Sequence, residues 1–114
     1  MSHLTTELVL KALDGLYERA SVTAENIANA GAPNYRPLRV SFEAALAQAA
    51  FKGPDAVKAV HPQIERDPTQ SAASGVRLDL EVATATATAM RYAALIEIIG
   101  RRGQLDEIAR SGNA

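Results

Sequence analysis

The chain has 114 residues, of which 47% are hydrophobic and 4% aromatic, with no cysteine and a formal net charge of −1. This length permits one domain at most, and the lack of cysteine excludes disulfides, thiolate metal sites and cysteine nucleophiles. A near-neutral charge gives no electrostatic footprint for nucleic acid, and the alanine-rich hydrophobic fraction predicts a thin core between long, closely packed helices.

Residues 4–30 are predicted to form one long amphipathic helix. Gly31 offers a positive-φ position that ends the helix, and Pro33 forbids its continuation. At 1.5 Å per residue this helix is about 40 Å long, which is longer than a single small globule requires. Its apolar positions alternate in spacings of four and three, as in a heptad stripe: Val9, Leu13, Leu16, Ala20, Thr23, Ile27 and Ala30.

The middle of the chain is predicted to be partly extended and rich in loops. Pro37 favours extended backbone over residues 34–40, and Ser41 is expected to cap a short helix over residues 42–51. Residues 52–75 contain recurrent Gly, Pro, Ser and Thr, which predicts a flexible, loop-rich segment. The apolar content of that segment is thin, consisting of Val57, Val60 and Ile64.

A second long helix is predicted over residues 78–110, with Asp79 as its N-cap. The Thr–Ala alternation inside it has the period of a strand, but we predict helix because helically spaced apolar residues run through it. Gly100 and Gly103 weaken the helix, so residues 105–110 are expected to form a separate turn or a frayed end. The apolar stripe consists of Val82, Ala85, Ala89, Tyr92, Ile96 and Ile99.

The expected fold is mostly α-helical and comprises a single domain over residues 1–114. Two long terminal helices pair as an antiparallel coiled coil, and a loop-rich, partly extended segment over residues 31–77 joins them. Each helix has more apolar surface than one partner covers, so neighbouring copies are expected to cover the rest. The residues predicted to pack within and between subunits are Val9, Leu13, Leu16, Ala20, Ile27, Val82, Ala89, Tyr92, Ile96 and Ile99.

Neither end of the chain has the pattern of a targeting or membrane segment. Residues 1–7 lack a basic region and a continuous apolar run, so no cleaved secretory signal peptide is expected. The longest unbroken apolar run near the C-terminus, over residues 93–96, is far too short to cross a bilayer.

Residues 13–46 resemble the N-terminal signature of the bacterial flagellar rod and hook proteins. Residues 76–81 and 92–95 resemble the C-terminal pattern of the B-type proximal rod subunit, and residues 61–64 resemble a His-containing element of its middle region. The signature positions are Asn26, Ile27, Ala28, Asn29, Pro33 and Tyr35, followed by Phe42 and Leu46.

Two positions depart from the family pattern. Ala32 stands where the family usually has Thr, which removes a capping hydroxyl, and Asn34 stands where it usually has Gly. Because Asn tolerates left-handed backbone better than other non-glycine residues, the turn is expected to survive.

The resemblance implies a structural subunit of the flagellar proximal rod that polymerises helically and transmits torque from the rotor ring toward the distal rod and hook. Its implied partners are further copies, other rod subunits, proteins of the rotor-ring/rod junction and the flagellar export gate. The implied location is the periplasmic rod of the basal body, reached through the flagellar type III apparatus.

The two signature asparagines admit two interpretations. Asn26 and Asn29 either fix helix register between subunits as buried polar groups, or favour the helix end and turn in which they lie. Phe42 and Leu46 resemble the Phe-x-x-x-hydrophobic element by which early flagellar substrates engage the export gate. Their i, i+4 spacing is equally that of core anchors on one helix face.

No chemistry is predicted from the remaining residues. His3 and His61 have no ligand partners at metal-binding spacing, and neither a phosphate-binding loop nor a catalytic triad occurs. We therefore expect no enzymatic activity, cofactor, metal or small-molecule substrate.

Two alternative functions remain open. One is a C-type proximal or distal rod subunit of the same family. The other is an unrelated helical hairpin acting as an adaptor or chaperone, which should be a stable monomer or a small closed oligomer. A rod subunit should instead be partly unfolded at its ends when free and ordered in the assembly.

Overall fold

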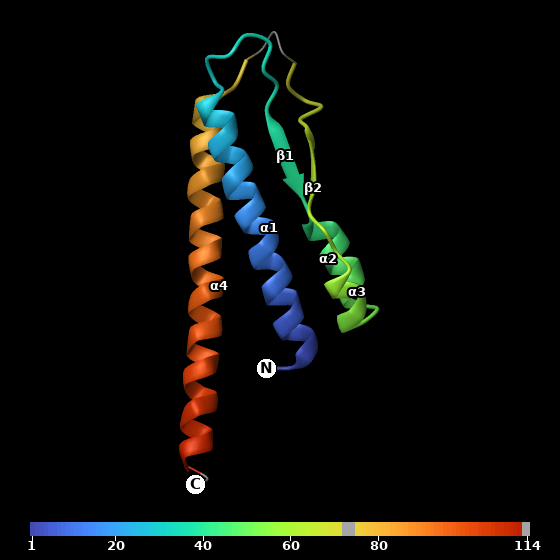
Figure 1. Ribbon diagram of the computed structural model, residues 1–114, viewed down its shortest axis with the longest axis vertical. Coiled ribbons are helices and arrows are strands. Elements are labelled where there is room, and N and C mark those ends of the chain that lie inside the picture. Colours follow the sequence, from blue (N-terminus) through green and yellow to red (C-terminus); the bar gives the residue numbers. More distant parts are fainter. Residues whose placement is uncertain (72–74, 113–114) are drawn as a thin grey trace.

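The computed structural model describes residues 1–71 and 75–112, which form four helices and one two-stranded sheet. The mostly helical fold is confirmed: the two long terminal helices contact each other and run antiparallel (Figure 1). In chain order the elements are α1 (His3–Ala28), β1 (Leu38–Ser41), α2 (Glu43–Ala50), α3 (Pro54–Lys58), β2 (Gln63–Arg66) and α4 (Leu78–Gly112).

Helix α1 lies at the centre of the molecule (Figure 1). Helix α4 packs along one side of it, and the sheet with α2 and α3 packs along the other. Strands β1 and β2 are antiparallel, with Val40 opposite Ile64. The Cα trace spans 64 × 27 × 14 Å, so the molecule is long and thin.

The two ends of α1 are closed by short polar side chains. Ser2 is the N-cap, and its hydroxyl accepts a hydrogen bond from the Thr5 N–H at 3.0 Å. At the other end, the Asn29 side chain donates to the Glu25 carbonyl at 2.8 Å. The predicted role of Gly31 is wrong, because Gly31 does not have a positive φ.

The left-handed residue of this turn is Asn34, with a φ of 64°. The turn therefore has a left-handed position at Asn34, as expected from the tolerance of asparagine for this region.

The middle of the chain is more ordered than predicted. Residues 52–71 contain α3 and β2, and Val57 is fully buried against α1 and α2. The N-cap of α2 is Phe42, without a side-chain capping bond, so the predicted capping role of Ser41 is wrong. Residues 72–74 of the predicted flexible segment lie outside the described residues.

The hydrophobic core lies mainly between α1 and the middle of the chain, not in the seam of the two long helices. Gly15 makes this packing possible, because a Cβ at that position would lie 2.4 Å from Cδ1 of Phe42. The phenyl ring therefore rests directly on the backbone of α1. The buried cluster consists of Leu16, Val22, Val40, Phe42, Leu46, Ala49 and Val57.

Helix α4 continues without a break to Gly112, so the separate turn predicted after Gly103 is wrong. The Thr–Ala stretch is helical, as predicted. Asp79 is not the N-cap, because the helix begins at Leu78 and Asp79 lies in its first turn, paired with Arg77 at 2.7 Å. Charge pairs at helical spacing support the last turns: Arg101–Glu97, Arg102–Asp106 and Arg110–Glu107.

Candidate functional site

Two signature residues, Asn26 and Tyr35, take part in a buried polar network centred on Asn26, whose side chain is fully buried. Its Oδ1 accepts hydrogen bonds from the Leu38 N–H and the Tyr35 hydroxyl, both at 2.9 Å. Its Nδ2 donates to the Leu38 carbonyl at 3.0 Å and to Oε2 of Glu81 at 3.1 Å. All four hydrogen-bonding positions of the amide are used, so Asn26 connects α1 with β1, the turn and α4.

Charged side chains extend this network away from Asn26. Oε1 of the fully buried Glu81 lies 2.8 Å from Nη1 of Arg39, a charge contact that lacks the alignment of a hydrogen bond. Nε of Arg39 in turn donates to Oδ2 of Asp67 at 2.9 Å. Removing Arg39, whose side chain is 33% exposed, would leave the buried Glu81 carboxylate without its charge partner, which is destabilising. The network therefore fixes how α4 and the sheet fit around α1.

Asp67 is held as a carboxylate at the end of β2. Its Oδ1 accepts hydrogen bonds from the hydroxyl and the backbone N–H of Thr69, at 2.6 and 2.8 Å. These two hydrogen bonds, and then the charge of Arg39, lower the pKa of Asp67 below its ordinary value. The hydrogen bonds from Thr69 thus stabilise the negative charge of Asp67 within the network.

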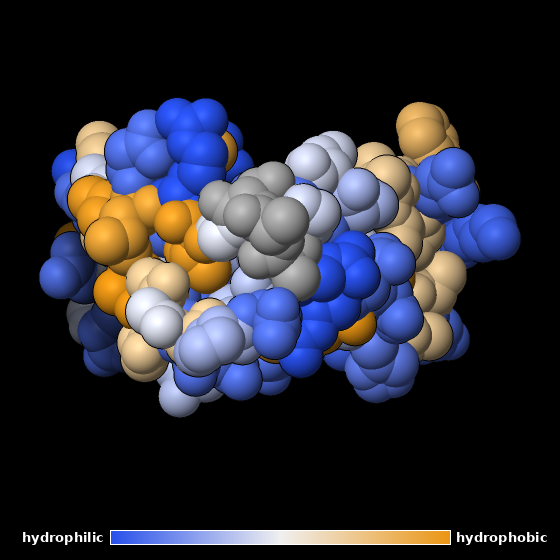
Figure 2. All heavy atoms as spheres, turned by 90° about the horizontal axis from the view of Figure 1, so that it is seen from above, coloured by the Kyte–Doolittle hydropathy of each residue, from blue (hydrophilic) through white to orange (hydrophobic). Residues whose placement is uncertain are grey.

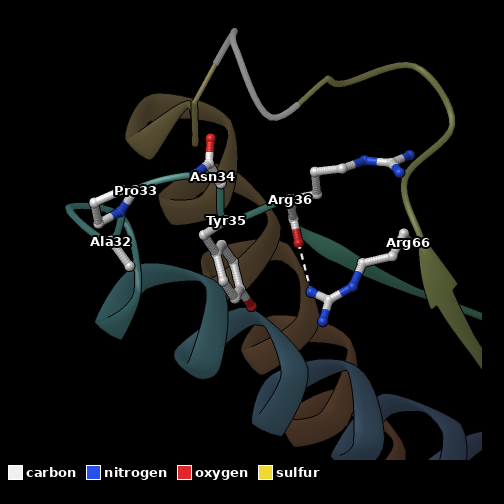
Figure 3. A pocket seen from close by; sticks show the side chains of 6 residues that line it. All are labelled: Ala32, Pro33, Asn34, Tyr35, Arg36 and Arg66. Atoms are coloured by element: carbon white, nitrogen blue, oxygen red, sulfur yellow. Dashed lines mark hydrogen bonds between the residues drawn. The ribbon is translucent and has the colours of Figure 1, made fainter.

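The turn after α1 forms one wall of an open pocket (Figure 3). The Tyr35 side chain points from the turn toward α1, whereas Asn34 points the opposite way. The Arg66 guanidinium lies 5.4 Å from the centre of the Tyr35 ring and donates to the Arg36 carbonyl at 2.7 Å. These contacts hold the turn against β2. The pocket is lined by Ala32, Pro33, Asn34, Tyr35, Arg36 and Arg66.

The predicted packing residues divide between the interior and the surface of the single chain. Leu13 and Leu16 are buried. Val9, Tyr92 and Ile99 are half-buried. The remaining five are exposed: Ala20, Ile27, Val82, Ala89 and Ile96.

The seam on α4 overlaps the predicted stripe in part: Ala85, Tyr92 and Ile99 are half-buried, whereas Val82, Ala89 and Ile96 are exposed. Glu81 and Thr88 are the buried residues of α4, and Leu95 is partly buried against the core. These three residues have heptad spacing and each precedes an exposed residue of the predicted stripe. Sequence periodicity did not reveal this edge, because a stripe that begins with glutamate does not register as apolar.

Phe42 and Leu46 lie in the core, with 5% and 8% of their surface exposed. The Arg19 guanidinium lies 4.9 Å from the centre of the Phe42 ring and donates to both carboxylate oxygens of Glu43, at 2.7 and 2.8 Å. These hydrogen bonds lower the pKa of Glu43. A contact of Phe42 and Leu46 with an export gate therefore requires the unfolded chain.

Outside the seam, α4 exposes an extensive apolar surface. Seen from the turn end, hydrophobic residues gather on the side of the molecule where α4 lies (Figure 2). On α1, Leu10, Tyr17 and Ile27 are also exposed. The large exposed hydrophobic residues of α4 are Leu78, Leu80, Val82, Met90, Ile96, Ile98, Leu105 and Ile108.

Length and composition alone would allow α4 to cross a membrane. An 18-residue window of this helix has a mean hydropathy of 1.3, and 6% of the window is buried. The unbroken run over residues 93–96 did not reveal this apolar content, because the hydropathy of α4 is an average over a helix that also contains polar residues.

No group of three or more His, Asp or Glu side chains that could hold a metal ion occurs within residues 1–71 and 75–112. Comparisons with models of known protein families and with curated proteins find no match to this chain. Its function is therefore inferred from its own geometry and signature residues.

Proposed function

We propose that this chain is a structural subunit of the proximal rod of the bacterial flagellum, a non-enzymatic protein that polymerises helically and transmits torque. The observation that supports assembly most strongly is the apolar surface of α4. Within its 35 residues, only Glu81 and Thr88 are buried. Monomeric soluble proteins rarely expose large contiguous apolar surfaces. Neighbouring copies packed along α4 would cover this one.

Two of the signature residues, Asn26 and Tyr35, support the flagellar assignment because they have a defined structural role. Asn26 uses all of its hydrogen-bonding capacity, and Tyr35 donates a hydrogen bond to Asn26. Asn34, which departs from the family pattern, still takes the left-handed position of the turn. Residues that stabilise this helix–turn geometry are what we expect a family that shares the geometry to have in common. The proposed partners are further copies, other rod subunits, rotor-ring/rod junction proteins and the export gate, in the periplasmic rod.

Insertion of α4 into a membrane explains the same apolar surface less well. Arg91 and Glu97 are both exposed on the apolar part of the helix, and a charged side chain at the bilayer centre costs about 2.5–3.5 kcal/mol. Glu97 also pairs with Arg101 at 2.6 Å. In an aqueous assembly these groups lie at the edge of an apolar contact and keep their hydration.

The proposal is tested by placing a charge on the exposed edge of α1. Ile27 is 37% exposed, so Ile27→Asp should leave the free chain folded but abolish swimming, because the charge would be buried without a partner between copies. Swimming in soft agar, with electron micrographs of basal bodies, measures the effect. The matched control is Ser21→Asp, at an exposed site on the same helix, which should swim normally.

Deletion of the gene provides the decisive result. A deletion strain should lack rods and hooks and recover them on complementation. Normal basal bodies in that strain would refute the proposed function.

A further inference from the structure

Phe51 is the most exposed large hydrophobic residue within residues 1–71 and 75–112, with 93% of its surface accessible. It follows α2 directly and precedes the turn at Gly53, whose φ of 115° only glycine adopts readily. The connection between α2 and α3, which carries Phe51, lies at the end of these helices nearest the N-terminus (Figure 1). Exposed aromatic residues that enter a pocket are typical anchors of protein interfaces.

An apolar groove of about 340 Å³ lies between α1, α4 and the start of α2. Large apolar side chains, Leu16, Phe42 and Leu95, line it, and Ala12 and Ala94 leave it open. A cavity of about 150 Å³ already accommodates benzene, so this groove has room for a phenyl ring and its stem.

Phe51 cannot enter the groove of its own chain. The groove borders the start of α2, whereas Phe51 follows the last residue of that helix. The intervening helix Glu43–Ala50 is about 12 Å long and holds the two sites apart. An occupant with this side chain must therefore come from another copy.

The charges around the ring and the groove are complementary. Lys52 and Asp55 flank Phe51, are exposed, and make no ion pair among the described residues. The groove is bordered by Arg91, which is likewise without an ion pair in the described chain, and by Glu43, whose side chain is 53% exposed beside Arg19. Lys52 and Asp55 beside Phe51 thus each have a group of opposite charge at the groove, Glu43 for Lys52 and Arg91 for Asp55.

We propose that Phe51 of one copy inserts into the apolar groove of the next copy. This contact rests on the proposed function and specifies which surfaces join neighbouring subunits. In this arrangement each copy gives its ring to one neighbour and receives the ring of another, so the contact is heterologous. Heterologous contacts that do not close into a ring generate an open helical chain.

Cross-linking between introduced cysteines tests the contact, because the chain has no cysteine of its own. Gln48 precedes Phe51 on exposed α2 surface, and Ala87 is exposed four residues before Arg91. The double variant Gln48→Cys/Ala87→Cys, treated with a short bis-maleimide, should give a ladder of multimers. The control Gln48→Cys/Gln104→Cys places the second thiol at an exposed site farther along α4 and should give none.

Phe51→Ala in the cross-linking background should lower the multimer yield by about tenfold or more, whereas Phe51→Tyr should retain it. Far-UV circular dichroism should be unchanged in both, because residue 51 contacts solvent. Sedimentation velocity over a range of concentrations measures self-association in parallel.

The outcomes separate this contact from the proposed function. Self-association that persists at full strength in Phe51→Ala overturns the contact and leaves the proposed function intact. A closed cross-linked dimer in place of the ladder overturns the open arrangement. A chain that stays monomeric at every concentration overturns both the contact and the self-polymerisation on which it rests.

Discussion

Replacing Asn26 by alanine tests the polar network directly. The substitution removes the donor to Oε2 of Glu81 and the acceptor for the Leu38 N–H, both buried or partly buried. The Leu38 carbonyl keeps a hydrogen bond from Arg39 Nη1 at 3.1 Å, and the half-buried Tyr35 hydroxyl can turn toward water. Two groups are therefore left without partners.

Each buried group left without a partner costs about 1–3 kcal/mol, so Asn26→Ala should lower the free energy of unfolding by about 2–6 kcal/mol. Typical domains have about 5–15 kcal/mol in total, so the loss should be a large fraction of the free energy of unfolding. Urea denaturation followed by far-UV circular dichroism measures the difference.

Asn29→Ala is the matched control one helical turn away. It removes a single exposed hydrogen bond to the Glu25 carbonyl and should cost less than about 1 kcal/mol. Equal losses in the two variants would refute the assignment of Asn26 as the centre of the network. Asn26→Asp keeps the shape but cannot donate and faces the Glu81 carboxylate, so it should be at least as unstable as Asn26→Ala.

Two further predictions concern packing and acid stability. Gly15→Ala should destabilise the chain by about 1–3 kcal/mol, because the added Cβ would collide with Phe42. Gly103→Ala has open space around it and should stabilise α4 by about 0.5–1 kcal/mol. Wild-type stability of Gly15→Ala in urea would contradict the packing of Phe42 on α1. The folded-state pKa of Glu43 is lowered by Arg19, so this pair contributes stability above a pH of about 4.3 and loses it as the pH falls through the folded-state pKa. Glu43→Gln should therefore cost less than about 1 kcal/mol at neutral pH and make urea midpoints less sensitive to acid; an equally steep acid dependence would show that the pair contributes nothing.

The long helices could be predicted from sequence because their periodicity is local. Helically spaced apolar residues outweighed the period-two alternation of Thr and Ala between Val82 and Ala89, and the structure confirms the helix. The sequence analysis overestimated how far Gly100 and Gly103 weaken the end of α4, because ion pairs such as Arg101–Glu97 stabilise the same turns.

The seam could not be predicted because it depends on contacts between distant segments. Glu81 is buried because Asn26, 55 residues earlier, and Arg39 meet its two oxygens. No local pattern marks a glutamate as interior. Hydropathy therefore favoured its neighbour Val82, which is 55% exposed.

The middle of the chain was underestimated for the same reason. Val57 is fully buried, although its short helix has little apolar content, because α1 and α2 supply the surface that covers it. Likewise, residues 63–66 form a strand through pairing with residues 38–41, which no pattern inside either segment indicates.

The Cα trace is 64 Å long but only 14 Å deep, about three times the roughly 4.6 Å width of the Cα trace of a single helix. Every side chain in so thin a molecule lies near one of its two broad faces. Little packed interior between the two faces is present to resist bending. Rigidity along the 64 Å length must then come from the molecules that pack against these two faces. For a part proposed to carry torque, mechanical strength would be a property of the stack, absent from the lone molecule.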